Sequence, residues 1–126
     1  MTGFAFDANI VIDALAGYTA ARSEIERAAS ANSRPWISRM AWIEILSKGD
    51  EAIVRDALAF LARFGLDELD DEISHRAAAL RRERPKLKSP DAVILATAQT
   101  RNRILVTRNI KDFPAGMPGI RVPYTL

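Results

Sequence analysis

Short apolar runs alternate with longer amphipathic segments along the whole chain. The apolar runs predict strands at residues 4–6, 36–38, 66–69, 104–106 and 120–122. The amphipathic segments predict helices at residues 20–31, 40–48, 51–64, 70–84 and 90–98. Strands that alternate with helices in this way are typical of a parallel sheet covered on both faces, so the pattern predicts an α/β fold.

Local signals place several helix ends. Thr19 is expected to cap the helix at 20–31. In Ser89-Pro90-Asp91, Ser89 is expected at the N-cap and Pro90 at the first helical position. The helix that follows is apolar almost all round, which predicts that it is largely buried. The helix at 51–64 has a broad apolar face, and we expect part of it to remain for a partner.

Length and composition are those of a soluble globular domain. The chain has 126 residues, of which 48% are hydrophobic and 27% charged, so we expect one domain over residues 1–126. The absence of cysteine excludes disulfides and thiolate chemistry. No apolar run is long enough for a membrane span, and the first residues do not resemble a secretory signal. We therefore expect a cytoplasmic protein.

The two parts of the chain carry opposite charge. Residues 1–75 hold 7 basic and 13 acidic residues, a net of −6, whereas residues 76–126 hold 11 basic and 3 acidic residues, a net of +8. This asymmetry indicates a polyanionic partner for the basic part and a cation or a basic partner for the acidic part, although two differently charged solvated faces would give the same asymmetry.

Four acidic residues are candidates for chemistry, and each also has an ordinary structural explanation. Asp7 directly follows the first strand but could cap the next helix. Glu44 lies among apolar neighbours but could point to solvent. Asp91 lies in a first helical turn, where it would favour the helix dipole. Asp112 follows the strand at 104–106 and could be a turn residue.

The placement of these acids favours a shared site. Parallel sheets of this class bind ligands at the carboxyl ends of their strands, where Asp7 and Asp112 are expected. A cluster of carboxylates is the oxygen-rich environment that Mg²⁺ or Mn²⁺ requires. A bound metal would activate water and neutralise charge on a phosphodiester, so the acids predict a metal-dependent nuclease.

Other hydrolytic chemistries lack their residues. His75 is the only histidine, so a ribonuclease built on two histidines is excluded. The sequence contains neither a nucleophile-elbow pattern nor a GxxxxGK[ST] loop. His75 is therefore interpreted as a structural or surface residue.

Basic residues precede and follow the candidate acids. A run before Asp91 and a residue after the fourth strand are predicted to contact RNA phosphates: Arg81, Arg82, Arg84, Lys86, Lys88 and Arg108. A cationic helix end and a solvated loop would also explain the run. Trp36 and Trp42 lie in apolar segments and are expected in the core.

Four motifs, in order along nearly the whole chain, resemble those of a known family. They are FDANIVID at 6–13, EIL at 44–46, DAVILATA at 91–98 and LVTRNIKDF at 105–113. This pattern resembles the PIN-domain ribonucleases and, more narrowly, the VapC toxins of bacterial type II toxin–antitoxin pairs. Ala8 departs from the pattern, because a hydroxyl residue commonly follows the first aspartate of that family.

The resemblance implies a three-layer α/β/α fold and a metal-dependent endoribonuclease toxin. It implies that Asp7, Glu44 and Asp91 bind Mg²⁺ or Mn²⁺, with Asp112 as the fourth acid. Two further residues are expected to support the site: Thr107 and Asn109, the latter as an alternative to Asp112. It also implies a homodimer and a cognate antitoxin, and Asp13 is read as structural.

Two other functions remain open at this stage. The chain could be a non-catalytic domain of the same fold that binds RNA or protein. It could also be a phosphotransfer domain with Asp7 as nucleophile. The second acid that such chemistry usually needs is replaced by Asn9.

Overall fold

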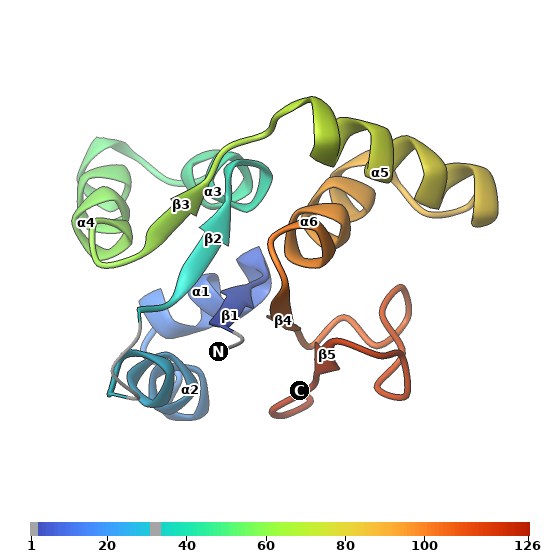
Figure 1. Cartoon of the computed structure of the whole chain (residues 1–126). Coiled ribbons are helices and arrows are strands. Elements are labelled where there is room, and N and C mark those ends of the chain that lie inside the picture. Colours follow the sequence, from blue (N-terminus) through green and yellow to red (C-terminus); the bar gives the residue numbers. More distant parts are fainter. Residues whose placement is uncertain (1–2, 31–33) are drawn as a thin grey trace.

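The structure is a computed structural model that describes residues 3–30 and 34–126 (Figure 1). Its strands are β1 (Gly3–Phe6), β2 (Trp36–Ser38), β3 (Gly65–Asp67), β4 (Arg103–Val106) and β5 (Ile120–Arg121). Its helices are α1 (Ala8–Leu15), α2 (Thr19–Ser30), α3 (Arg39–Leu46), α4 (Glu51–Leu61), α5 (Asp71–Glu83) and α6 (Ser89–Thr100).

The strands form one sheet in the order β3-β2-β1-β4-β5, and every neighbouring pair is parallel. In the central pair, Phe6 lies opposite Val106. The residues that follow these two, Asp7 and Thr107, therefore leave the sheet side by side at its carboxyl edge. The backbone N–H of Asp7 donates to the carbonyl of Val106 at 2.9 Å, which extends the pairing to this point.

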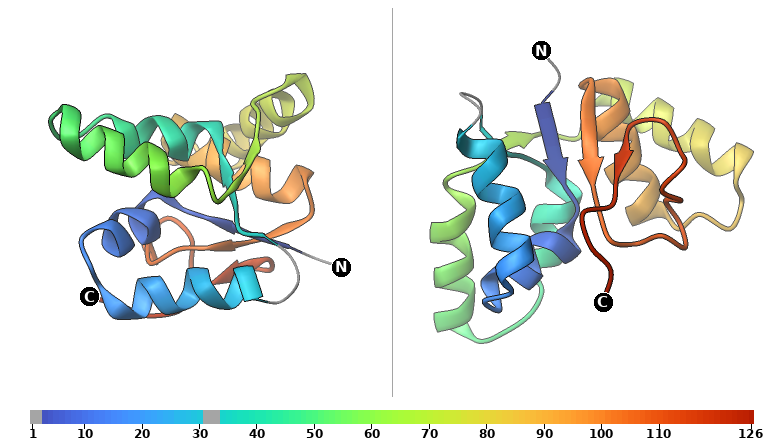
Figure 2. Two further views of the ribbon diagram at one scale, coloured as in Figure 1. Left: turned by 90° about the vertical axis from the view of Figure 1, so that its left-hand side faces the viewer. Right: turned by 90° about the horizontal axis from the view of Figure 1, so that it is seen from below.

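Helices cover both faces of the sheet. Helices α1 and α2 pack together on one side, and α5 and α6 pack together on the other (Figures 1 and 2). The predicted three-layer α/β/α fold with a central parallel sheet is thus confirmed. Fully buried apolar side chains from both layers and from the sheet form the core, among them Phe6, Ile10, Ile25, Ile37, Leu95 and Leu105.

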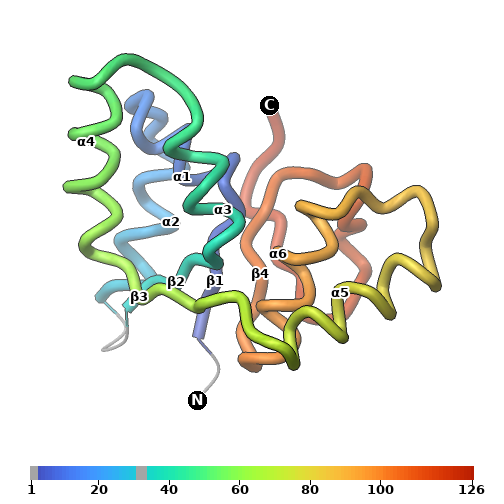
Figure 3. Tube along the Cα trace, turned by 90° about the horizontal axis from the view of Figure 1, so that it is seen from above, coloured from blue at the N-terminus to red at the C-terminus, as the bar shows by residue number. Residues whose placement is uncertain are grey.

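Helix α3 joins the two helical layers. It contacts α1 on one side and α6 on the other, and it lies between them when the molecule is seen from above (Figure 3). Ser38 caps α3, accepting a hydrogen bond from the backbone N–H of Ala41 at 3.1 Å. Gly49 follows the helix with a positive φ of 96°, a conformation that glycine adopts without strain. Because α3 contacts both α1 and α6, Glu44 on α3, Asp91 on α6 and Asp7 at the N-cap of α1 are brought towards one place.

The predicted helix ends need correction in detail. Ser89 does not cap α6: Lys88 occupies the N-cap without a side-chain bond, and Ser89 is the first helical residue. Thr19 is likewise the first residue of α2 and not its cap, and Ala31, its predicted end, lies outside the described residues. Helix α4 ends at Leu61 because the chain must turn to bring Phe64 onto Phe6 in the core.

Burial agrees with the expectation for α6 and only partly for α4. Most of the apolar side chains of α6 are buried. On α4, Ala57 and Leu61 are buried, but Ile53 and Leu58 remain 56% and 45% exposed. Within the described part of the chain, no helix has the length and apolar character needed to cross a membrane.

Candidate active site

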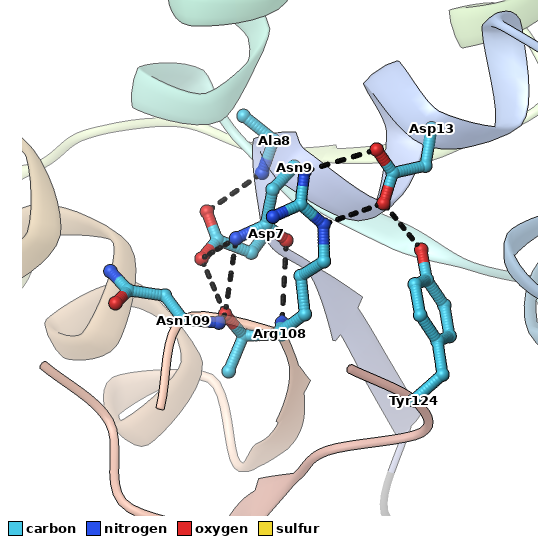
Figure 4. A network of polar contacts seen from close by, with 8 residues as sticks. Asp7, Ala8, Asn9, Asp13, Arg108, Asn109 and Tyr124 are labelled. Atoms are coloured by element: carbon cyan, nitrogen blue, oxygen red, sulfur yellow. Dashed lines mark hydrogen bonds and ion pairs between the residues drawn. The ribbon is translucent and has the colours of Figure 1, made fainter. Parts of the chain in front are cut away.

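Asp7 lies at the centre of the site because β1 ends and α1 begins at this residue. Its side chain caps α1, and Oδ1 accepts a hydrogen bond from the backbone N–H of Ala8 at 2.7 Å. Oδ2 accepts one from the hydroxyl of Thr107 at 2.7 Å (Figure 4). The side-chain Nδ2 of Asn9 donates to the same oxygen at 3.4 Å. Both the capping role and the strand-end placement that the sequence indicated therefore apply to this buried carboxylate.

Glu44 and Asp91 reach the same cavity from two other elements. Glu44 comes from the last turns of α3 and Asp91 from the first turn of α6. Together with Asp7 they line an open cavity of about 490 Å³ at the carboxyl edge of the sheet. The remaining lining residues are Ala8, Asn9, Ile12, Ser47, Lys48, Arg108 and Asn109. Glu44 is thus half-buried at the cavity and does not simply point to bulk solvent.

These acids act on one another's ionisation. Burial raises the pKa of Asp7, and the charge of Asp112 raises it further, while the Thr107 hydroxyl opposes this. Burial and the charges of Asp7 and Asp91 raise the pKa of Glu44. Burial, then Asp112 and Asp7, raise the pKa of Asp91 from 3.8 to about 6. Carboxylates that repel one another in this way favour a cation between them.

Asp112 joins the cluster through the loop after β4. Asn109 donates from its side chain to Oδ2 of Asp112 at 3.1 Å, so the two residues considered for the fourth position lie together. After burial, the charge of Asp112 contributes most to the raised pKa of Asp91. The guanidinium of Arg84 donates to the backbone carbonyl of Asp112 at 2.6 Å and so fixes the loop.

The donor set fits a hard divalent cation. Its members are carboxylate oxygens from four segments, and neutral hydrogen-bond donors hold those of Asp7 and Asp112. In the arrangement of residues 3–30 and 34–126, no three acidic or histidine side chains are close enough to ligate one ion together. Mg²⁺ keeps several of its waters and usually takes only one or two protein carboxylates, so this spacing suits it.

The predicted RNA-binding residues lie at different distances from the cavity. Lys88 is close enough to Asp91 to lower its pKa, and Arg108 lines the cavity itself. Lys86 and Arg84 line a neighbouring hollow that also includes Asp112. Arg82 is exposed on α5, and Arg81 donates to the carbonyl of Leu87 in the loop after α5. The basic run is therefore divided, and only its later members lie near the acids.

The structure adds residues that the sequence did not assign to the site. Asn9 and Lys48 line the cavity, and the position of Asn9 two residues after Asp7 is the sequence signal that indicates it. Asp13 is buried and holds Arg108 through two hydrogen bonds of 2.7 and 3.1 Å. Tyr124, near the end of the chain, donates to the same carboxylate at 2.7 Å (Figure 4). No local sequence pattern connects Asp13, Arg108 and Tyr124, which are far apart in the sequence.

Comparison with known proteins identifies the family. The family model of the PIN domain matches residues 4–115. The chain belongs to the PIN-domain family. This PIN domain is 37% identical to a chain of a toxin–antitoxin complex from Klebsiella pneumoniae, with a TM-score of 0.88 over 98% of this chain and 100% of that one. No curated protein matches the sequence.

More distant structures share the fold of this PIN domain. A chain of the DNA-bound VapBC complex from Salmonella typhimurium is 24% identical with a TM-score of 0.77, covering 96% of each chain. A chain of VapBC2 from Rickettsia felis, bound to a fragment of its promoter, is 23% identical with a TM-score of 0.77, covering 93% of this chain and 94% of that one. PIN domains are in general nucleases.

Proposed function

We propose that this PIN domain is a metal-dependent endoribonuclease and the toxin of a type II toxin–antitoxin pair. The observation that carries the proposal is the convergence of Asp7, Glu44, Asp91 and Asp112 from four segments, three of them with pKa values raised by burial and by one another. Such a cluster is costly to maintain unless a cation occupies it in the working protein. Mg²⁺ or Mn²⁺ is the cation that suits these oxygen ligands.

Each residue has a definite task in this proposal. Asp7, Glu44, Asp91 and Asp112 surround the proposed metal, which would be bound directly by one or two of these carboxylates and through its waters by the others. When bound, the metal would lower the pKa of a coordinated water and neutralise charge on the phosphodiester. Thr107 and the backbone N–H of Ala8 hold the Asp7 carboxylate in place.

The remaining residues of the cavity support the acids and attract the substrate. Asn109 orients Asp112. Lys48 and Arg108, which also line the cavity, would attract an RNA phosphate into a site that is otherwise acidic.

The proposed partners follow from exposed apolar residues and from the structural relatives. Ile43, Ile53 and Leu58 are 46%, 56% and 45% exposed on the neighbouring helices α3 and α4. We propose that this surface serves a homodimer or the antitoxin, since apolar patches of this kind commonly mark protein interfaces. The Klebsiella relative is itself part of a toxin–antitoxin complex. A single domain over residues 1–126 acting on cytoplasmic RNA completes the proposal.

A cleavage assay tests the proposal. The purified chain is incubated with end-labelled RNA in Mg²⁺, in Mn²⁺ and in EDTA, beside Glu44→Gln and Asp91→Asn variants. A matched control is Asp71→Asn, which removes an exposed carboxylate from the first turn of α5, away from the cavity. We expect endonucleolytic cleavage by the wild type and the control with metal, and none by the two site variants or in EDTA.

The same assay separates the alternatives. RNA that binds without being cut in either metal would replace the proposal with a non-catalytic RNA-binding domain. An acyl phosphate trapped on Asp7 would replace it with phosphotransfer chemistry. Full cleavage by Glu44→Gln or Asp91→Asn would show that the site assignment is wrong.

A further inference from the structure

Three segments far apart in the sequence meet at the carboxylate of Asp13. Asp13 belongs to α1, Arg108 to the loop after β4, and Tyr124 to the segment after β5. Nε and Nη2 of Arg108 donate to Oδ2 and Oδ1 of Asp13 at 2.7 and 3.1 Å. The Tyr124 hydroxyl donates to Oδ2 at 2.7 Å. The carboxylate thus receives three hydrogen bonds, two of them as a planar fork.

This arrangement fixes the orientation of the guanidinium. An arginine fork on a carboxylate defines both the plane and the direction of the group, unlike a lysine ammonium. Tyr124 holds the carboxylate from its other side, and its ring rests on Tyr18 with centroids 4.9 Å apart. Asp13 is therefore held in one position, and Arg108 with it. The side chain of Arg108 remains 31% exposed, so the fixed cation is still accessible.

The free edge of the guanidinium faces the acidic cavity. Nε and Nη2 are bonded to Asp13, whereas Nη1 has no hydrogen-bond partner among residues 3–30 and 34–126. Figure 4 shows the guanidinium between Asp13 and Asp7, with this nitrogen on the side of Asp7. Arg108 lines the cavity beside Asp7, and its charge lowers the pKa of that carboxyl.

An acidic cavity needs such a cation to admit a polyanion. The carboxylates of Asp7, Glu44 and Asp91 in the cavity, and Asp112 beside it, repel an RNA phosphate even when a divalent ion offsets part of their charge. Lys48 and Arg108 are the basic residues that line the cavity. Lys48 is exposed, and a flexible side chain loses entropy when a ligand orders it. Arg108 is already ordered by Asp13, so it can bind a phosphate oxygen at lower entropic cost.

We propose that Arg108 binds an RNA phosphate at or next to the cleaved bond, and that Asp13 and Tyr124 are positioning residues that aim its free nitrogen at that phosphate. The inference rests on the proposed function, because it assumes that RNA enters this cavity. It gives a role to the end of the chain, which contributes no acid to the cluster. It also explains why a buried carboxylate is kept at position 13, where an apolar residue would pack without needing a partner.

The test uses RNA in which one phosphate at a time is replaced by a neutral methylphosphonate. Dissociation constants are measured in an Asp91→Asn chain, so that binding is read without cleavage. With Arg108 intact, one replacement should weaken binding about tenfold, the cost of losing a charged hydrogen bond. In the Arg108→Gln chain, the same replacement should have little further effect, because the interaction is already absent. Tyr124→Phe should weaken binding to unmodified RNA about three- to fivefold.

Two further variants separate positioning from charge and from stability. Arg108→Lys keeps the charge but not the fork, and it should bind RNA nearly as poorly as Arg108→Gln. Arg121→Gln breaks a similar fork, in which Arg121 donates to Glu24 at 3.0 and 2.8 Å outside the cavity. This control should leave both the dissociation constant and the methylphosphonate pattern unchanged. In chains with Asp91 intact, Tyr124→Phe and Asp13→Asn should raise KM more than they lower kcat.

The outcomes are distinct. The inference is overturned if the methylphosphonate pattern is the same with and without Arg108, or if Arg108→Lys binds as tightly as the wild type. It is also overturned if Tyr124→Phe and Arg121→Gln have equal effects, because the network would then be only structural. Absence of metal-dependent cleavage by the wild type would instead refute the proposed function, while the binding measurement would still report on Arg108.

Discussion

Replacing Asp91 by asparagine should stabilise the metal-free protein while abolishing its activity. Asp91 lies in the first turn of α6, and its carboxyl is partly buried near Asp7 and Asp112. Its pKa is raised from 3.8 to about 6, so the ionised form is less favourable in the folded chain than in the unfolded one. Asparagine has nearly the same shape and carries no charge. The variant therefore removes the repulsion and leaves the packing intact.

The magnitude follows from the size of the shift. A rise of about two pH units corresponds to about 3 kcal/mol at neutral pH. Asp91 is partly exposed, and solvent screening reduces this to about 1–2 kcal/mol. Losing a carboxylate from the first turn of a helix costs about 0.5 kcal/mol. The net gain in the free energy of unfolding is about 1 kcal/mol, or about 3–5 °C in Tm for a domain of this size.

The assay is thermal and urea unfolding of wild type and Asp91→Asn in EDTA. The folded-state pKa of Asp91 is raised, so the penalty is complete above about pH 6 and disappears as the pH falls towards 3.8. We expect the variant to be more stable at pH 7.5 and equal to the wild type near pH 4. Mg²⁺ should stabilise the wild type more than the variant. A variant that is less stable at pH 7.5, or a gain that is unchanged at pH 4, would refute this reasoning.

Three other changes have expected outcomes. Thr107→Val removes the hydroxyl that donates to Asp7, so it should lower kcat at least about tenfold in a cleavage assay. It should also lower the free energy of unfolding in urea by about 1–3 kcal/mol. An unchanged kcat would exclude a supporting role for Thr107. Arg121 lowers the pKa of Glu24, so this pair should stabilise the fold by about 0.5–1 kcal/mol above pH 4.5 and lose the effect as the pH falls below it. The stability difference between wild type and Arg121→Gln should therefore shrink between pH 6 and pH 3.5, and a constant difference would contradict the assignment. Gly49→Ala places a Cβ 2.5 Å from a side chain in the first turn of α4 at a φ of 96°, and should lower stability by about 1–2 kcal/mol; a neutral result in urea unfolding would show that the turn relaxes freely.

The sequence was sufficient for the fold because the signals were local. Apolar runs of three or four residues that alternate with longer amphipathic segments are typical of a chain that alternates between buried strands and covering helices. The strand ends at Phe6 and Val106 then placed Asp7 and Thr107 at one edge, and the parallel pairing of β1 with β4 brought them together. The helix boundaries were harder to predict, because an N-cap is defined by backbone geometry as well as by residue type. Ser89 has the side chain of a typical N-cap residue but is the first residue inside α6.

The contacts of Asp13 with Arg108 and Tyr124 could not be predicted from the sequence. Asp13 and Arg108 are 95 residues apart, and Asp13 and Tyr124 are 111 residues apart. Contacts of this range depend on the complete fold, and a tyrosine near the end of a chain has no pattern that indicates its partner. The basic run before Asp91 shows the converse, because charges adjacent in sequence separate once α5 ends: Arg81 donates to the carbonyl of Leu87, whereas Lys88 lies near Asp91.

The dependence of RNA cleavage on Mg²⁺ concentration tests the central claim most directly. Single-turnover rates are measured for the wild type and for Asp7→Asn, from EDTA to saturating Mg²⁺, with one labelled RNA. The carboxylate cluster predicts no cleavage by the wild type in EDTA, a rate that rises to saturation with Mg²⁺, and a rate for Asp7→Asn that is at least about a hundredfold lower at every concentration. Cleavage by the wild type in EDTA, or an Asp7→Asn chain that reaches the wild-type rate, would contradict it.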